Sequence, residues 1–127
     1  MLKAKRVGTA IPAQDVKRAR EFYEQKLGFT PSHELPDGGV MYRVGDTGFT
    51  IFPSSGKASG THTQMGIDVE DVEEAVKELK SRGVKLEEYD MPHFKTVDGI
   101  LTLPDGSKEA WFKDTEGNLI GVGSLAV

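Results

Sequence analysis

Histidine, glutamine and carboxylate side chains are the groups in this chain that could bind a metal ion, and the histidines and scattered carboxylates could also transfer a proton. The chain has three histidines and no cysteine, which excludes disulfides, thiolate metal sites and a cysteine nucleophile. His62 and Gln64 are separated by one residue, so on a strand both side chains would face the same side and could approach one ligand. His33 falls in a different predicted strand, and His93 falls in a predicted loop. Because none of them has the spacing of a metal motif, we interpret each histidine as exposed or hydrogen-bonded.

A second feature is the alternation of glycine with aliphatic residues in "LIGVG", residues 119–123. Glycine weakens a strand and leaves nothing to pack, so it usually marks a place where something else comes close. By strand alternation, Gly121 and Gly123 share one face of the predicted sheet. We expect that face either to leave room for an organic ligand or to be filled by a bulky neighbour, such as Phe52 or Trp111.

The segment "YDMPHFKTVDG", residues 89–99, groups aromatic, methionine and histidine side chains around Pro92. Loops held on a rigid sheet often carry binding residues, so this segment is a candidate rim for a ligand site. Tyr89 and His93 are its candidate contacts. A small satellite core packed under the loop is the alternative interpretation.

Two similar segments must position these residues, "AIPAQDVKRAREFYEQKLGF" from Ala10 and "GIDVEDVEEAVKELKSRGVK" from Gly66. In each, a short apolar strand leads to an aspartate, Asp15 or Asp71, that predicts a helix N-cap, and apolar residues then recur at helical spacing. Short strand patterns separated by turn dipeptides follow each helix. The sequence therefore predicts two β-α-β-β-β modules in one α+β domain. The predicted boundaries are about 5–53 for module one, 54–61 for the connector and about 62–125 for module two.

Composition narrows the class of protein. The 127 residues favour one domain with a hydrophobic core, and the net charge is −4. The basic residues are scattered, which argues against nucleic acid as a partner. The first residues, "MLKAKRV", lack the apolar run of a signal peptide, and no segment has the length of a membrane span. We therefore expect no membrane partner and a cytoplasmic location.

Three stretches resemble the vicinal oxygen chelate superfamily, the glyoxalase and bleomycin-resistance fold. They are "QDVKRAREFYEQKLGF" (14–29), "VEDVEEAVKELKSRGVK" (69–85) and "FKDTEGNLIGV" (112–122). One departure is Thr115, at a turn position where the family usually has proline. The resemblance covers essentially the whole chain and implies that the two modules form a large, curved, incompletely closed sheet with a concave cup. It does not specify an activity, because one fold hosts many functions.

The resemblance also implies where a metal would be held. Metal-binding members use His, Gln or Glu on the first and last strands of each module. The matching positions in this sequence are Gly8, Phe52, Gln64 and Gly121. Two glycines, a phenylalanine and a single glutamine do not supply the roughly three donor side chains that a catalytic divalent ion needs. We therefore expect no metal and no other cofactor.

The favoured function is that of a metal-independent protein that binds a small organic ligand in the cup. One alternative is an enzyme of the superfamily, a metal-dependent or metal-free lyase, isomerase or dioxygenase; another is a non-enzymatic partner domain. The resemblance implies a homodimer, because small members of the family pair to complete each cup. The expected ligand-binding residues are Gly8, Phe52, His62, Gln64, Gly66, Tyr89, His93, Trp111 and Gly121.

Overall fold

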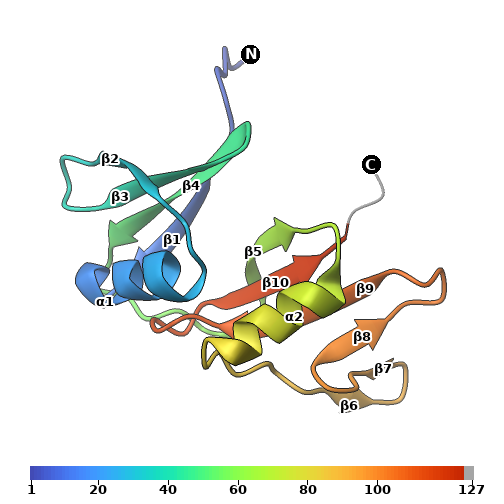
Figure 1. The fold of residues 1–127 in the computed structure, drawn as a ribbon. Coiled ribbons are helices and arrows are strands. Elements are labelled where there is room, and N and C mark those ends of the chain that lie inside the picture. The colour runs from blue at the N-terminus through green and yellow to red at the C-terminus, as the bar shows by residue number, and fades with distance from the viewer. Residues whose placement is uncertain (125–127) are drawn as a thin grey trace. The chain divides into compact units, whose positions relative to one another are not determined.

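The computed structural model describes residues 1–124 and consists of two compact units, Met1–Lys57 and Ala58–Val127 (Figure 1). Leu125, the last residue of the predicted second module, lies outside the described residues. Each unit contains one four-stranded mixed sheet with a helix. The predicted α+β class is therefore confirmed.

The first unit builds its sheet in the order β1-β4-β3-β2, with β1 parallel to β4 and the other neighbours antiparallel. Its helical segment connects β1 to β2 and contacts β4. The elements are β1 (Thr9–Ala13), α1 (Val16–Glu21), η1 (Phe22–Lys26), β2 (Pro31–Glu34), β3 (Val40–Val44) and β4 (Thr47–Pro53).

The helix of the first unit begins at the predicted cap, where the Asp15 carboxylate accepts a hydrogen bond from the Arg18 backbone N–H at 3.0 Å. From Phe22 onward the helix widens into a π-helical turn rather than continuing as the predicted α-helix. The wider turn changes which side chains face the sheet. Ala19 and Tyr23 are fully buried, whereas Leu27 is only half-buried.

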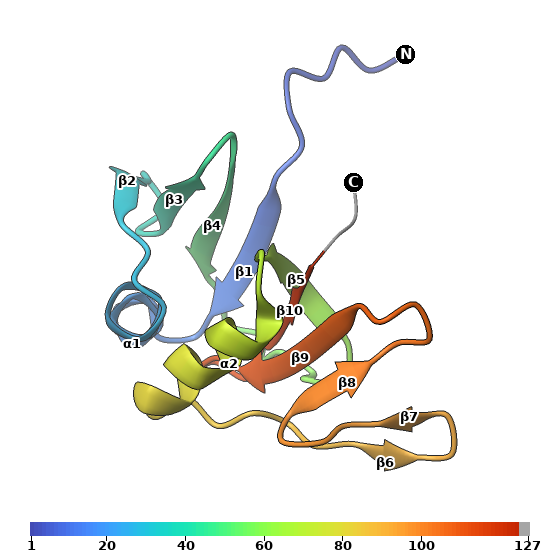
Figure 2. The ribbon, with the colours of Figure 1, turned by 45° about the vertical axis from the view of Figure 1, so that its right-hand side comes forward.

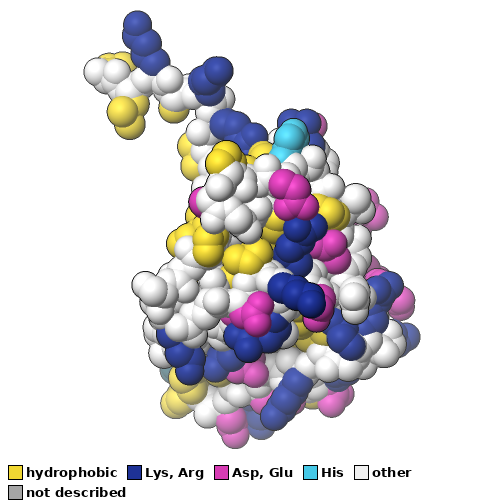
Figure 3. Space-filling view, turned by 90° about the vertical axis from the view of Figure 1, so that its left-hand side faces the viewer, with side chains coloured by type: hydrophobic (Ala, Val, Ile, Leu, Met, Phe, Trp, Pro, Cys, Tyr) yellow, Lys and Arg dark blue, Asp and Glu magenta, His cyan; other side chains and the backbone are white. Residues whose placement is uncertain are grey.

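Residues 1–8 precede β1 and carry no helix or strand. Met1, Leu2 and Val7 are almost fully exposed. Figure 3 shows this segment standing away from the body of the first unit, with Lys and Arg side chains along it. It therefore contributes nothing to the core of that unit.

The second unit repeats the topology, with strand order β5-β10-β9-β8 and β5 parallel to β10. A two-stranded hairpin, β6–β7, is added between the helix and β8. The elements are β5 (Thr63–Asp68), α2 (Val72–Ser81), β6 (Asp90–Met91), β7 (Phe94–Lys95), β8 (Ile100–Thr102), β9 (Lys108–Lys113) and β10 (Leu119–Gly123).

Helix α2 covers one face of this second sheet, lying against β9 and β10 (Figure 2). Asp71 caps its first turn by accepting a hydrogen bond from the Glu74 backbone N–H at 3.1 Å. Its apolar side is buried, as is the sheet face that carries Phe112 and Ile120. Because side chains alternate along a strand, Trp111 and Gly121 lie on the opposite face.

The segment after α2 differs from the prediction. The stretch "VKLEEYD" is not a full strand: Leu86 makes a single bridge to Phe112, and the chain then leaves the sheet to form the β6–β7 hairpin. The Glu88 carboxylate stabilises this departure by accepting hydrogen bonds from the Thr96 hydroxyl and the Gly99 backbone N–H, each at 2.7 Å. Among residues 1–124 no helix is long and apolar enough to cross a membrane.

Candidate functional site

The open face of the second sheet contains a hollow of about 240 Å³. All of its lining residues come from β5, β9 and β10. They are Thr63, Gly66, Ile67, Asp68, Glu109, Trp111, Gly121, Val122 and Gly123.

Strand register explains why this face is hollow. In the pairing of β5, β10 and β9, Gly121 stands between Gly66 and Trp111. One step along the same face, Gly123 stands between Asp68 and Glu109. The central strand therefore offers no side chain on this face over two successive rows, and the side chains of its neighbours stand around the gap.

The two glycines of the first row, Gly66 and Gly121, have different surroundings. A Cβ atom at Gly66 would have nothing within 4 Å, so the space above it is open. At Gly121 a Cβ atom would lie 3.3 Å from Nε1 of Trp111 and 3.4 Å from Cγ2 of Thr63. Gly121 is thus covered by the protein's own side chains, whereas Gly66 opens into the hollow.

Trp111 forms the aromatic wall of the hollow and is held on several sides. Its indole N–H donates a hydrogen bond to Oγ1 of Thr63 at 3.2 Å. Its ring centroid lies 5.8 Å from that of Tyr89, in an edge-to-face arrangement, and 5.3 Å from that of Phe94. The β6–β7 hairpin supplies Phe94, so the segment predicted as a rim loop supports Trp111 through a small aromatic cluster.

Six lining residues were not among the predicted ones: Thr63, Ile67, Asp68, Glu109, Val122 and Gly123. Thr63 reaches the hollow because the pairing of β5 with β10 shifts by one residue between Leu119 and Ile120, which strict alternation from the sequence does not reveal. Asp68 and Glu109 each lie two residues from a predicted site residue on the same strand face. Extending the alternation along β5 and β9 would have found both.

The predicted site residues are not all brought together. Gly66, Trp111 and Gly121 line the hollow, and Tyr89 contacts Trp111. Gln64 is half-buried beside the irregular step in β5. That Gln64 contacts a ligand stays a prediction.

Both predicted histidines are exposed. His62 has its Nδ1 3.1 Å from the Ser59 hydroxyl, and His93 occupies the turn between β6 and β7. Gly8 and Phe52 belong to the first unit, where Phe52 pairs with Pro12 across β4 and β1. A ligand-binding role for these four residues stays a prediction.

Among residues 1–124, no three His, Asp or Glu side chains are grouped so that they could hold a metal ion. Of the four ligand positions that the family resemblance implies, only Gln64 carries a donor side chain, so the residues present do not fit a divalent ion. The titratable group beside Trp111 is the Tyr89 phenol. Burial, and secondarily the Glu87 carboxylate, raise the pKa of Tyr89 above its ordinary value, so it stays neutral at physiological pH.

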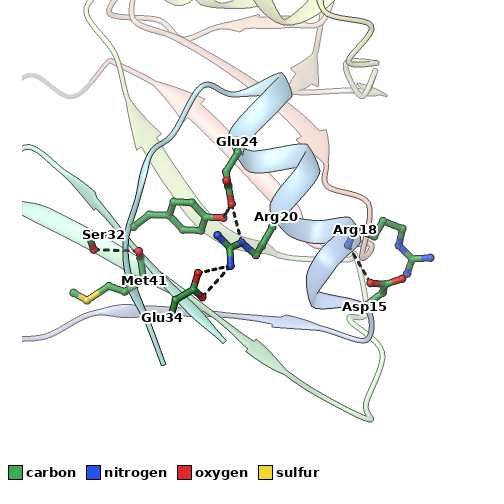
Figure 4. Close-up of polar contacts among 8 residues, drawn as sticks. Asp15, Arg18, Arg20, Glu24, Ser32, Glu34 and Met41 are labelled. Atoms are coloured by element: carbon green, nitrogen blue, oxygen red, sulfur yellow. Dashed lines mark hydrogen bonds and ion pairs between the residues drawn. The ribbon is translucent and has the colours of Figure 1, made fainter. Parts of the chain in front are cut away.

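A polar cluster in the first unit, outside the hollow, connects the π-helical turn to the sheet (Figure 4). The Arg20 guanidinium donates to the carboxylates of Glu24 and Glu34, in each case at 2.9 Å. The buried Tyr42 hydroxyl donates to Glu24 at 2.7 Å. Burial raises the pKa of Glu24, but the hydrogen bonds from Tyr42 and Arg20 outweigh it, so the pKa lies below its ordinary value. The Arg20 guanidinium and the Tyr42 hydroxyl thus both donate to carboxylates of the same unit, which indicates a structural role for the cluster.

Solved structures with the same fold include proteins of different function. The antibiotic-binding protein TnmS3 from Streptomyces sp. CB03234 superposes with a TM-score of 0.69 at 20% identity, over 99% of this chain and 100% of that one. A bleomycin-binding protein in complex with bleomycin gives 0.71 at 19% identity, over 96% and 99%. Lactoylglutathione lyase from Agrobacterium tumefaciens gives 0.70 at 20%, over 95% and 94%. At these identities the likeness establishes the fold alone.

Sequence comparison gives the family. No curated protein matches the chain significantly. The profile of the Glyoxalase/Bleomycin resistance protein/Dioxygenase superfamily matches residues 6–122. The resemblance noted in the sequence is therefore confirmed, and the chain belongs to the Glyoxalase/Bleomycin resistance protein/Dioxygenase superfamily.

Proposed function

We propose that this protein binds a small, flat organic molecule in the hollow of the second sheet, without a metal ion. The observation that carries the proposal is the open space above Gly66, next to the fixed indole of Trp111. A concave site with an aromatic wall and a few polar groups is the usual form of a small-molecule site. The antibiotic-binding and bleomycin-binding proteins of the same fold support this assignment.

Binding is favoured over catalysis by the chemistry of the lining. Two lining side chains are able to transfer a proton, Asp68 and Glu109, and they stand on either side of Gly123. Among residues 1–124, no group of three His, Asp or Glu side chains could hold a metal ion beside them. General acid–base catalysis needs a group whose pKa is tuned to its task and which lies within hydrogen-bond reach of the reacting atoms. Tyr89, the perturbed group nearby, is shifted away from ionisation. These features support ligand retention rather than turnover.

The test uses Trp111, the only tryptophan in the chain. Its indole N–H gives a single, well-separated cross-peak in a ¹H–¹⁵N NMR spectrum of labelled protein. Bleomycin and a panel of flat aromatic compounds are titrated against this peak. We expect at least one compound to shift it in a saturable manner, and Gly66→Leu to abolish that shift by filling the hollow.

The outcome that would refute the proposal is equally direct. If no compound moves the indole peak, or if Gly66→Leu binds as well as the parent protein, the hollow is not a ligand site. Gly56→Leu is the matched control, because Gly56 lies in the first unit, is exposed, and a Cβ atom there would meet only Oγ of Ser54, at 3.7 Å.

We further propose that the protein acts as a homodimer. The sheets of both units end in edge strands, β1 and β2 in the first unit and β5 and β8 in the second. An uncovered edge presents unpaired backbone groups that a second copy can cover. The dimer is also what the family resemblance implies.

A further inference from the structure

We propose that Thr63 is a positioning residue that limits the width of the hollow, because its hydroxyl holds the indole of Trp111 over Gly121. With the indole in this place, the open space is restricted to the side of Gly66. The inference deepens the proposed binding function and rests on it. It concerns the width of the molecule that the hollow admits.

Two adjoining glycines lie beneath the hollow, and the protein covers one of them. Gly66 on β5 and Gly121 on β10 are register partners, and paired strands lie about 4.8 Å apart. A Cβ atom at Gly121 would lie 3.3 Å from Nε1 of Trp111 and 3.4 Å from Cγ2 of Thr63, whereas a Cβ atom at Gly66 would have nothing within 4 Å. The indole therefore forms the boundary between covered and open backbone.

A hydrogen bond holds the indole at this boundary. The Trp111 N–H donates to Oγ1 of Thr63 at 3.2 Å, a distance at the long end of the ordinary range. Trp111 is on β9 and Thr63 on β5, so the bond crosses the central strand β10, which carries Gly121. Thr63 reaches this face because the register of β5 against β10 shifts between Leu119 and Ile120. The bond thus fixes the ring above the central strand.

The remaining contacts of the indole that we describe are aromatic. Its ring centroid lies 5.8 Å from that of Tyr89 and 5.3 Å from that of Phe94. Aromatic pairs are stable both edge-to-face and offset-stacked, whereas a hydrogen bond weakens steeply as its angle changes. The Trp111 side chain is half-buried, so water can accept from its N–H if the bond to Thr63 breaks. We therefore assign the position of the ring to Thr63 rather than to the hairpin.

The position of the indole decides how wide a ligand can be. A narrow ring system over Gly66 meets the indole as a wall and leaves the bond to Thr63 intact. A wider ring system that also covers Gly121 must first displace the indole, and the complex then lacks this hydrogen bond. The loss of one such bond changes an equilibrium by about two- to tenfold. Thr63 therefore favours narrow ligands over wide ones.

The experiment compares two neutral probes that share a hydroxyl group and differ in width, 2-naphthol and 1-hydroxypyrene. Binding is followed at the Gly66 backbone amide and the Trp111 indole N–H in ¹H–¹⁵N spectra. Thr63→Val keeps the methyl group over Gly121 and removes the hydroxyl. We expect this variant to shift the ratio of the two affinities about fivefold toward 1-hydroxypyrene, relative to the parent protein.

A second measurement needs no ligand. Exchange of the Trp111 indole proton with water should be about fivefold faster in Thr63→Val than in the parent protein, because the proton has lost its acceptor. Thr63→Ser retains a hydroxyl and should restore both the slow exchange and the parent ratio of affinities. Thr102→Val is the matched control, because Thr102 is an exposed residue of β8 outside the hollow, and it should change neither quantity.

Two results would overturn the inference while the proposed binding function stands. One is indole exchange that is equally fast in the parent protein and in Thr63→Val. The other is an affinity ratio that Thr63→Val leaves unchanged although both probes bind. Failure of both probes to shift either peak, in the parent protein and in every variant, would contradict the binding function and the inference together.

Discussion

At the scale of single residues, the two glycines beside Trp111 have opposite meanings. Gly66 leaves space that nothing in its surroundings fills, whereas Gly121 is small because Trp111 and Thr63 lie over it. The sequence raised both interpretations for the glycine-rich face. The structure shows a glycine covered by neighbouring side chains at Gly121 and open space at Gly66. That this open space takes an organic ligand stays a proposal.

This contrast predicts different stabilities for two matched substitutions. Gly121→Leu should destabilise the fold by roughly 1–3 kcal/mol, because the added side chain collides with an indole that is itself held by Thr63, Tyr89 and Phe94. Gly66→Leu should leave the melting temperature nearly unchanged, since its Cβ enters open space. Equal melting temperatures for the two variants in thermal denaturation would contradict this account.

At the scale of elements, the polar cluster of Arg20, Glu24 and Tyr42 fixes the π-helical turn on the first sheet. The folded-state pKa of Glu24 lies below the ordinary value of 4.5, so the native state favours its ionised form. The contribution of the ionised Glu24 carboxylate to the free energy of unfolding is therefore complete above pH 4.5. This contribution is lost as the pH falls through the lower, folded-state pKa.

Glu24→Gln tests this linkage. At pH 7 the variant should be less stable by about 1 kcal/mol, a value that allows for partial exposure of the Glu24 side chain. The difference should shrink as the pH falls below 4.5. Urea titrations at several pH values measure it, with the exposed Glu21→Gln as control. A difference independent of pH would show that Glu24 acts through packing rather than charge.

The secondary-structure elements could be predicted from the sequence more fully than the residues of the site. The caps at Asp15 and Asp71 and both helices could be predicted, because capping and helical spacing are local signals. The π-helical turn and the departure of residues 84–90 from strand geometry depend on tertiary contacts such as those of Tyr42 and Glu88. Thr63 was missed because a register shift inverts the face expected from alternation.

At the scale of the whole molecule, the proposal of a homodimer makes a simple prediction. Light scattering at micromolar protein concentration should give twice the 13.9 kDa chain mass. The physical reason is that a second copy can pair with the unpaired backbone groups of an edge strand and bury exposed apolar surface. A monomer mass under these conditions would contradict the proposal.

Metal independence is also a property of the whole molecule. After expression in medium supplemented with zinc, iron, manganese and nickel, elemental analysis should find far less than one ion per chain. The reason is that Gly8, Phe52 and Gly121 occupy ligand positions of the family and have no donor atoms in their side chains. One tightly held ion per chain would instead favour an enzyme of the superfamily.

The central claim is that the hollow binds an organic ligand without a metal, and one titration tests it most directly. Protein treated with EDTA is titrated with bleomycin and with the panel of flat aromatic compounds while the Trp111 indole cross-peak is followed, in parallel with Gly66→Leu. The account predicts a saturable shift in the parent protein and none in the variant. A peak that does not move, or that moves only after a divalent metal is restored, would contradict it.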